Sequence, residues 1–474
     1  MGDAPVLRPY QSDLIEALRA AFRMGFRAPL LQLATAAGKT VIFAAAAHGA
    51  RAKGRRVLVL AHRIELVKQA ADKLATAGVP ASMLVAGGTV PADTCAVVAS
   101  IQTIVNRLDT IGDFGFIVLD EAHHATAPTW RKVLAACPAA WLLGVTATPV
   151  RLDGTGLGVE AGGLFDVLVE GPAIAELTRM GYLAPARYFV PERRLDTSGI
   201  ATVGGDYSAA GLERLMAADS RIVGDCIDAY RRHASHQPAI CFVVTVAHGE
   251  AVAAQFRAAG YRAACVHGEL PAAERDALIA GLGNGRIEVL CSCELISEGL
   301  DVPAVGAVIL LRPTQSLGLH LQQLGRGLRP APGKECLIVL DHVGNVLAHG
   351  RADDARRWSL AAGAVRGTGE APVKRCPECG AANAIAARTC ENCGADFPVG
   401  ERDLTPAPGE LVELTRQRID WLSHQPHHRL RGMVLSEAEV HAVGRERGYK
   451  PGWARFYLRE QAERMGGPPH ANQS

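Results

Sequence analysis

Short apolar runs, each followed by a longer segment with helical periodicity, constrain the fold of this chain more than any other feature. The runs form two series: residues 57–60, 116–119 and 141–145, then residues 239–244, 289–291, 307–311 and 337–340. Buried parallel strands joined by crossover helices have this pattern, because a strand covered on both faces is apolar throughout. The sequence therefore predicts an α/β protein with two parallel-sheet lobes.

Hydrophobic periodicity fades at two places, which we interpret as domain boundaries. Pro, Gly, Asp and Ser collect around residues 190–208, and Gly and Ala dominate residues 361–373. Such segments are typical of connectors. The predicted organisation is a first lobe at 1–190, a connector at 191–208, a second lobe at 209–365, a zinc ribbon at 374–398 and a short, mainly helical tail at 399–474.

The composition is that of a globular chain. Of the 474 residues, 49% are hydrophobic and 21% charged, and no apolar run reaches the roughly 20 residues that a membrane span needs. The first five residues carry an acid and no apolar core of a secretory signal. We therefore expect a soluble, cytoplasmic protein without a membrane partner. Because 50 Lys and Arg nearly balance 48 Asp and Glu, a polyanion would have to bind local basic clusters.

A candidate phosphate-binding loop, residues 34–40, lies between a strand-like run at 30–33 and a helical run at 41–52. Small residues let backbone N–H groups approach phosphates, and the helix N-terminus adds its positive dipole end. Leu33 replaces the first Gly of the general G-x-x-x-x-G-K-[ST] pattern, so a chance Gly-Lys-Thr is the alternative. The loop residues assigned to nucleotide binding are Ala36, Ala37, Gly38, Lys39 and Thr40. Lys39 would neutralise the β and γ oxygens, and Thr40 would bind Mg²⁺.

Two adjacent carboxylates, Asp120 and Glu121, directly follow the apolar run at 116–119. Phosphoryl transfer to water needs an acid that binds the metal and a group that orients and deprotonates the water. We assign the first role to Asp120, together with Thr40, and the second to Glu121. The alternative is a solvated acidic turn at the end of a strand.

These two segments resemble motifs I and II of superfamily 2 helicases in the DEAH-box form, and further motifs follow in order over about residues 5–345. The resemblance implies two RecA-like lobes that hydrolyse ATP between them. Residues 8–11 resemble the upstream element that contacts adenine, which implies that Gln11 reads the adenine edge with Tyr10 nearby. Many relatives have Gly in place of Ala36, and we expect phosphate binding to survive this change if the backbone φ there is negative.

Other segments resemble the motifs that contact nucleic acid or couple hydrolysis to lobe movement: 61–66 (motif Ia), 100–103 (the next strand-binding motif), 146–149 (motif III) and 241–248 (motif IV). Residues 297–303 resemble motif V, which implies that Gly299 and Asp301 contact the nucleotide. The resemblance gives coupling or nucleic-acid contact to His62, Arg63, Gln102, Thr103, His123, Thr146, Thr148 and Gln322.

Residues 322–329 resemble motif VI, whose two arginines, here Arg326 and Arg329, are the family's finger residues. A guanidinium presented from outside the phosphate loop stabilises the charge of the transition state. Both arginines belong to the second predicted lobe, so they would reach the phosphates only when the lobes close, which ties hydrolysis to movement. An ordinary Arg-rich helix face is the alternative.

Four cysteines form two C-x-x-C-G knuckles separated by ten residues: Cys376, Cys379, Cys390 and Cys393. Paired knuckles place four thiolates around a structural Zn²⁺, with no open position for catalysis. A redox or disulfide pair is the alternative. The ribbon could grip nucleic acid or dock a partner, and its sequence does not distinguish these purposes.

The tail combines basic and aromatic residues. Between His441 and Arg459 the basic residues are Arg445, Arg447, Lys450, Arg455 and Arg459, the acid is Glu446, and the aromatic residues are Tyr449, Trp453, Phe456 and Tyr457. Aromatic rings can stack on bases while cations meet phosphates. The alternative is a small helical unit whose aromatics pack on the ribbon or the second lobe.

The motor motifs, the Asp341-His342-x-Gly344-Asn345 segment, the ribbon and the ending at residues 449–454 together resemble the bacterial RadD group of DNA-repair ATPases. This resemblance implies single-stranded or branched DNA as substrate, a role in double-strand-break repair or recombination, and contact with single-strand-binding or recombination proteins. The motor subunit of a restriction system and an RNA-directed DEAH-box helicase are alternatives. A zinc-containing nucleic-acid adaptor without ATPase activity is disfavoured, because a decayed site has no reason to keep Lys39, Glu121, Arg326 and Arg329.

Overall fold

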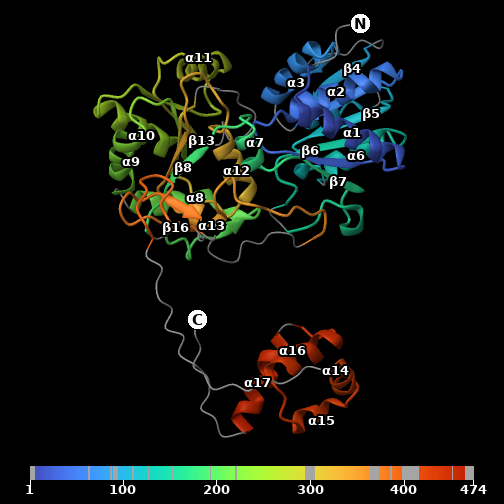
Figure 1. Cartoon of the computed structure of the whole chain (residues 1–474). Helices are drawn as coiled ribbons and strands as arrows, with labels where there is room; N and C mark the ends of the chain where they lie inside the picture. Colours follow the sequence, from blue (N-terminus) through green and yellow to red (C-terminus); the bar gives the residue numbers. More distant parts are fainter. Residues whose placement is uncertain are drawn as a thin grey trace. The chain divides into compact units, whose positions relative to one another are not determined.

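The computed structural model describes residues 6–61, 64–85, 88, 94–108, 112–125, 127–151, 154–192, 194–218, 221–293, 305–362, 373–384, 387–397, 416–450 and 452–464. The chain divides into two compact units, Met1–Pro398 and Val399–Ser474 (Figure 1). Each unit is described by itself.

The first lobe is built on a seven-stranded sheet in the order β3-β4-β2-β5-β6-β1-β7, with every neighbouring pair parallel. Its strands are β1 (Pro29–Gln32), β2 (Val57–Ala61), β3 (Ser82–Leu84), β4 (Ala96–Ser100), β5 (Phe116–Asp120), β6 (Trp141–Thr146) and β7 (Val167–Glu170). Its helices are α1 (Pro9–Arg23), α2 (Lys39–Ala52), α3 (Ile64–Thr76), α4 (Ile101–Ile104), α6 (Pro128–Ala135) and α7 (Ile174–Arg179). The central strands are buried along their whole length, as the apolar runs predicted.

The second lobe has a six-stranded parallel sheet in the order β12-β13-β11-β14-β15-β8. Its strands are β8 (Ala186–Phe189), β11 (Ala239–Val243), β12 (Ala263–Val266), β13 (Val289–Cys293), β14 (Ala307–Leu310) and β15 (Leu337–Asp341). Its helices are α8 (Ala209–Ala218), α9 (Arg221–His233), α10 (Val246–Ala258), α11 (Ala272–Gly283), α12 (Leu317–Gly325) and α13 (Asn345–His349). The expected two-lobed α/β fold is thus confirmed.

The sequence did not indicate two features of the chain around the predicted connector. Strand β8 lies within the segment assigned to the first lobe, yet it pairs with β15 at the edge of the second sheet. A short antiparallel hairpin, β9 (Thr202–Val203) and β10 (Asp206–Tyr207), lies within the predicted connector. The chain therefore enters the second lobe before the polar connector begins.

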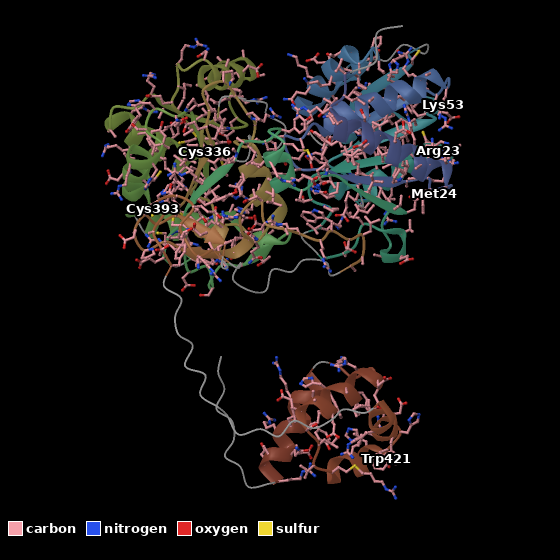
Figure 2. The ribbon with its side chains drawn as sticks, viewed as in Figure 1. Arg23, Met24, Lys53, Cys336, Cys393 and Trp421 are labelled. Carbon is pink, nitrogen blue, oxygen red and sulfur yellow. The ribbon has the colours of Figure 1, made fainter. Side chains whose placement is uncertain are left out.

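The ribbon packs on the free edge of β8. It contains the antiparallel strands β16 (Val373–Arg375) and β17 (Ala382–Ala384), and Figure 2 labels Cys393 within it. Ala381 forms a bridge with Phe189, and the Arg375 Nε donates a hydrogen bond to the Val190 carbonyl at 3.0 Å. Because Cys376 and Cys390 also belong to the core cluster of the second sheet, the ribbon is an integral part of this lobe.

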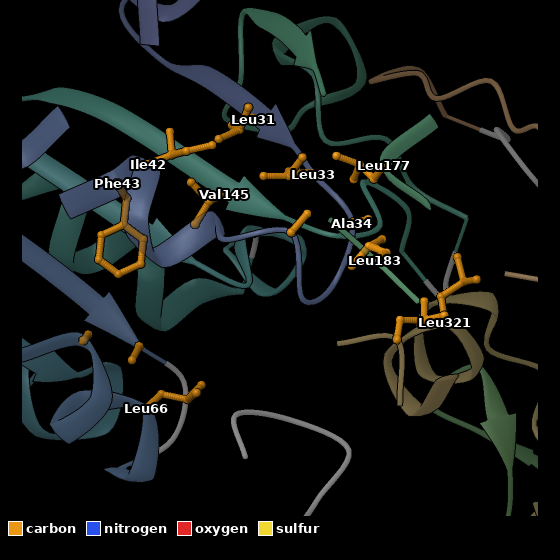
Figure 3. Packing of buried hydrophobic residues seen from close by; sticks show 14 of the residues in the cluster. Leu31, Leu33, Ala34, Ile42, Phe43, Leu66, Val145, Leu177, Leu183 and Leu321 are labelled. Atoms are coloured by element: carbon orange, nitrogen blue, oxygen red, sulfur yellow. The ribbon is translucent and has the colours of Figure 1, made fainter. Parts of the chain in front are cut away.

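A continuous apolar cluster connects the two lobes (Figure 3). Leu33 and Ala34, at the end of β1, are buried in the same cluster as Leu183 and as Leu321 on α12. The lobes approach each other closely at Gly325, where a Cβ atom would lie 2.4 Å from the Cβ of Thr35. Only glycine therefore allows α12 to touch the loop that follows β1.

The C-terminal unit consists of α14 (Arg416–Ser423), α15 (His427–Gly432), α16 (Glu437–Glu446) and α17 (Gly452–Arg464). It has its own core, made of Leu422, Leu430, Leu435, Val440, Val443, Ala454 and Tyr457. A capping box starts α16, in which Ser436 and Glu439 satisfy each other's backbone N–H groups. Among the described residues of the whole chain, no helix is long and apolar enough to cross a membrane.

Candidate nucleotide site between the lobes

The loop between β1 and α2 has the geometry of a phosphate cradle. Gly38 adopts φ +89° immediately before α2, and a Cβ atom there would lie 2.5 Å from the Gln11 Nε2. The Tyr10 hydroxyl donates a hydrogen bond to the Ala37 carbonyl at 2.6 Å, and the Gln11 Nε2 donates to the same oxygen at 3.5 Å. The start of α1 thus fixes the loop from one side, with Tyr10 and Gln11 beside it.

Ala36 does not meet the condition of a negative φ under which we expect phosphate binding to survive. Its φ is +69°, in the left-handed region. This conformation costs a non-glycine residue roughly 1–2 kcal/mol because Cβ approaches the carbonyl oxygen. The loop therefore holds Ala36 in a conformation that glycine adopts without strain.

Ala36→Gly is expected to raise the midpoint of thermal unfolding by about 1–2 °C, because removing Cβ relieves a strain of about 1 kcal/mol. Ala46→Gly is the matched control, since Ala46 lies within α2 and glycine there should lower stability by about 1 kcal/mol. Thermal unfolding of both full-length variants measures the two effects. Equal losses of stability would contradict the strain assigned to Ala36.

Lys39 begins α2 and lies among the charged residues of both lobes. Its Nζ donates to the Leu33 carbonyl at 3.4 Å. Burial lowers the pKa of Lys39; the nearby carboxylates of Glu121 and Asp120 oppose this shift, and Arg326 and Arg329 add to it. The charged groups that the sequence assigned to catalysis therefore lie close enough together to interact electrostatically.

The two carboxylates lie at the end of β5, opposite the loop. Asp120 is the last residue of the strand, and its Oδ1 accepts a hydrogen bond from the Glu121 N–H at 3.0 Å. Glu121 has φ +46°, another left-handed conformation, and only 12% of its side chain is exposed. Strained backbone of this kind clusters at functional sites, where surrounding packing maintains it.

Hydrogen bonds extend from Glu121 to both lobes. The Gln322 Nε2 on α12 donates to the Glu121 Oε2 at 3.5 Å, and the His123 Nδ1 lies 3.5 Å from the same oxygen. The His123 Nδ1 is also 3.0 Å from the Thr146 Oγ1, which in turn accepts from the Thr148 N–H at 3.2 Å. Glu121 is thus connected to α12 on one side and to the end of β6 on the other.

The turn after α12 carries the two arginines. Arg326 directly follows the helix, and Arg329 is partly buried, which lowers the pKa of its guanidinium. The Lys334 Nζ donates to the Arg329 carbonyl at 2.8 Å and to the Gly327 carbonyl. Burial lowers the pKa of Lys334 to about 8. Lys334 is not among the predicted site residues, because a single lysine after a Pro-Gly turn carries no signal of its own.

Lys334→Met is expected to lower kcat for ATP hydrolysis about tenfold with little change in the KM for ATP, since small misplacements of catalytic groups cost rate more than binding. Lys334→Arg should recover part of the loss, because it keeps donors near both carbonyls. Steady-state kinetics with Lys132→Met as control, an exposed lysine on α6, measures this. An equal change in both parameters, or a loss shared by Lys132→Met, would contradict a positioning role.

Some of the predicted contacts lie elsewhere or outside the described residues. Ser100 caps α4, its Oγ accepting from the Thr103 N–H, while Gln102 is exposed on the same short helix. Thr40 is half-buried at the start of α2. Of the predicted site residues, four lie outside the described part of the chain: His62, Arg63, Gly299 and Asp301.

The ribbon cysteines fit a tetrahedral metal site. Their four Sγ atoms lie within 4.8 Å of one another, and the pairs Cys376–Cys393 and Cys379–Cys390 are 3.7 and 3.6 Å apart. Four sulfurs about 2.3 Å from a central Zn²⁺ would have almost this spacing. The Asn392 Nδ2 donates to the Cys379 Sγ at 3.2 Å, a support that the spacing of the knuckles did not reveal.

Comparison with protein families matches both lobes. The family model described as type III restriction enzyme, res subunit, matches residues 4–151, and the family model described as helicase conserved C-terminal domain matches residues 221–331. A 51.5 kDa protein of a Lactococcus phage is 33% identical over 404 residues, which cover 84% of this chain and 85% of the phage protein. The chain belongs to the superfamily 2 helicases. As a member, it is an ATP-dependent enzyme.

Other relatives of this helicase are longer. The Saccharomyces cerevisiae protein named ATP-dependent helicase IRC3 is 30% identical over 364 residues, which cover 72% of this chain and 52% of the yeast protein. The chain therefore spans about half the length of that relative. Among solved structures, the fold is shared by a fragment described as an HsdR subunit of a type I restriction enzyme from Vibrio vulnificus. Its TM-score is 0.57 at 22% identity, and the match covers 74% of this chain and 66% of that one. A DNA-bound type ISP restriction-modification enzyme shares the fold with a TM-score of 0.53, 18% identity and coverage of 71% and 28%.

Proposed function

We propose that this helicase is a DNA motor that hydrolyses ATP between its two lobes and acts in repair or recombination. The observation that carries the proposal is the meeting of Lys39 and Glu121 of the first lobe with Arg326 and Arg329 of the second around one partly buried site. A phosphoryl-transfer site needs cations on both sides of the transferred group. Lobe closure then controls hydrolysis.

Each residue has a role in this proposal. Gln11 and Tyr10 lie beside the adenine, and the loop from Ala36 to Gly38 holds the phosphates. Thr40 and Asp120 would hold Mg²⁺, which supplies charge neutralisation at the phosphate oxygens. Glu121 orients and deprotonates the attacking water, while Arg326 and Arg329 stabilise the transition-state charge.

The hydrogen bonds around Glu121 support coupling to nucleic acid. When α12 moves, the Gln322 contact with Glu121 changes, and His123 links the same carboxylate to Thr146. The hydrogen bonding of the catalytic base therefore depends on the position of the second lobe. Nucleic acid would lie across both lobes, contacting His62, Arg63, Gln102 and Thr103 on the first, with Gly299 and Asp301 acting at the nucleotide.

DNA as the polymer is supported by the combination of motor, ribbon and tail that resembles the RadD group. The resemblance also favours partners such as single-strand-binding or recombination proteins. A restriction motor is the second candidate, because the model described as type III restriction enzyme, res subunit, matches the first lobe. That function would require a partner that cuts DNA.

Steady-state ATP hydrolysis tests the substrate class. We expect single-stranded or branched DNA to raise kcat for ATP hydrolysis at least about tenfold over the rate without polymer, because DNA lying across both lobes would favour their closure. RNA should stimulate less. Stimulation by RNA alone would assign the enzyme to RNA remodelling, and stimulation only in the presence of a nuclease subunit would favour the restriction motor.

A further inference from the structure

The C-terminal unit carries aromatic side chains that its core covers only in part, among them Trp453, one face of which packs on that core. Tyr457 is buried, and its hydroxyl donates to the Leu430 carbonyl. In contrast, 51% of Phe456 is exposed, and Trp453 and Tyr449 are half-buried. A folded domain normally covers rings of this size, so an exposed group of them marks an interaction site.

These rings form a row. The Tyr449 and Trp453 ring centroids are 4.7 Å apart, and His427 lies 6.4 Å from each of them. The Trp453 Nε1 donates to the His427 Nε2 at 3.4 Å, which fixes the two rings relative to each other. Phe456 lies one helical turn from Trp453 on α17, so the two share a face. We call His427, Tyr449, Trp453 and Phe456 the aromatic row.

Cations border the aromatic row. Lys450 and Arg459 are exposed, and the Arg459 guanidinium lies 6.0 Å from the Phe456 ring. The nearby acids are Glu446 on α16 and Glu460 and Glu463 on α17. Glu463 approaches Arg459 at 3.8 Å, but both side chains are more than half exposed, so the pair is weak and can open.

We propose that the aromatic row and its bordering cations bind single-stranded nucleic acid. Partly exposed rings can stack only on bases that are free of a duplex, while Lys450 and Arg459 neutralise phosphates. A duplex offers phosphates but no free base faces, so it would meet the cations without the rings. The row therefore selects single strands and gives the helicase a second contact with the strand outside the lobes.

Fluorescence anisotropy with a thymidine oligonucleotide, without ATP, tests this in the full-length protein. Phe456→Ser combined with Arg459→Gln is expected to raise the single-strand Kd about tenfold and to flatten its dependence on salt. Trp421→Ser combined with Arg429→Gln is the matched control, because it also removes an exposed ring and an exposed arginine from the unit (Trp421 is labelled in Figure 2). The control should stay within about twofold of the unaltered protein.

The outcomes separate this inference from the proposed function. The inference deepens the proposed function, but binding is read without hydrolysis, so a failed motor would leave the anisotropy result interpretable. Unchanged single-strand affinity, an equal loss in the control, or a loss confined to duplex DNA would each overturn it. Thermal unfolding of both variants distinguishes lost contacts from a lost fold.

Discussion

Replacing Glu121 by Gln is expected to lower kcat for ATP hydrolysis at least about a hundredfold, the scale of general base catalysis. Gln keeps the shape of the side chain and its place beside Gln322 and His123 but cannot accept the proton of water. ATP binding should stay within about threefold of normal, since the group acts in the transition state. Steady-state kinetics and nucleotide titration measure the two quantities.

The control for this variant is Glu160→Gln, which removes an exposed carboxylate of the first lobe. It should leave both quantities unchanged. If Glu121→Gln retained full turnover, another group would have to activate the water. The assignment of the β5 carboxylates would then be overturned.

Replacing Cys390 by Ser should cause a loss of stability of more than about 4 kcal/mol in the second lobe, as expected when a structural metal is lost. Cys390 is 3% exposed and shares a core cluster with residues of β11, β14 and β15. Because the ribbon covers the edge of β8, its unfolding would also expose that strand. Metal analysis should find about one Zn²⁺ per chain in the unaltered protein and much less in the variant.

Cys95→Ser provides the comparison, since Cys95 is an exposed cysteine of the first lobe. Cys95→Ser should bind as much Zn²⁺ as the unaltered protein and unfold at the same temperature. Full metal content in Cys390→Ser, or no metal in the unaltered protein, would contradict the zinc site. A chelator should reproduce the effect of Cys390→Ser on the unaltered protein but leave Cys390→Ser itself unchanged.

The sequence predicted those parts of the fold that local patterns determine. The apolar runs before Lys39 and Asp120 become β1 and β5, because strands buried on both faces need continuous apolar side chains. The four cysteines also come together as predicted, since two tight knuckles leave few ways to arrange their thiols.

Long-range packing decided the rest. Nothing local distinguishes β8 from a first-lobe strand, because its partner β15 lies far along the chain. The left-handed φ of Ala36 follows from the closure of the loop against Tyr10 and Gln11, against the intrinsic preference of alanine. Lys334 likewise gains its contacts only after α12 and the following turn have folded.

Displacement of a triplex-forming strand from duplex DNA reports whether this helicase moves along DNA as it hydrolyses ATP. We expect the full-length protein to release the third strand only with hydrolysable ATP, and Glu121→Gln to release none. Release at the same rate without ATP, or DNA-stimulated hydrolysis with no release from any substrate, would contradict the account of this helicase as a motor.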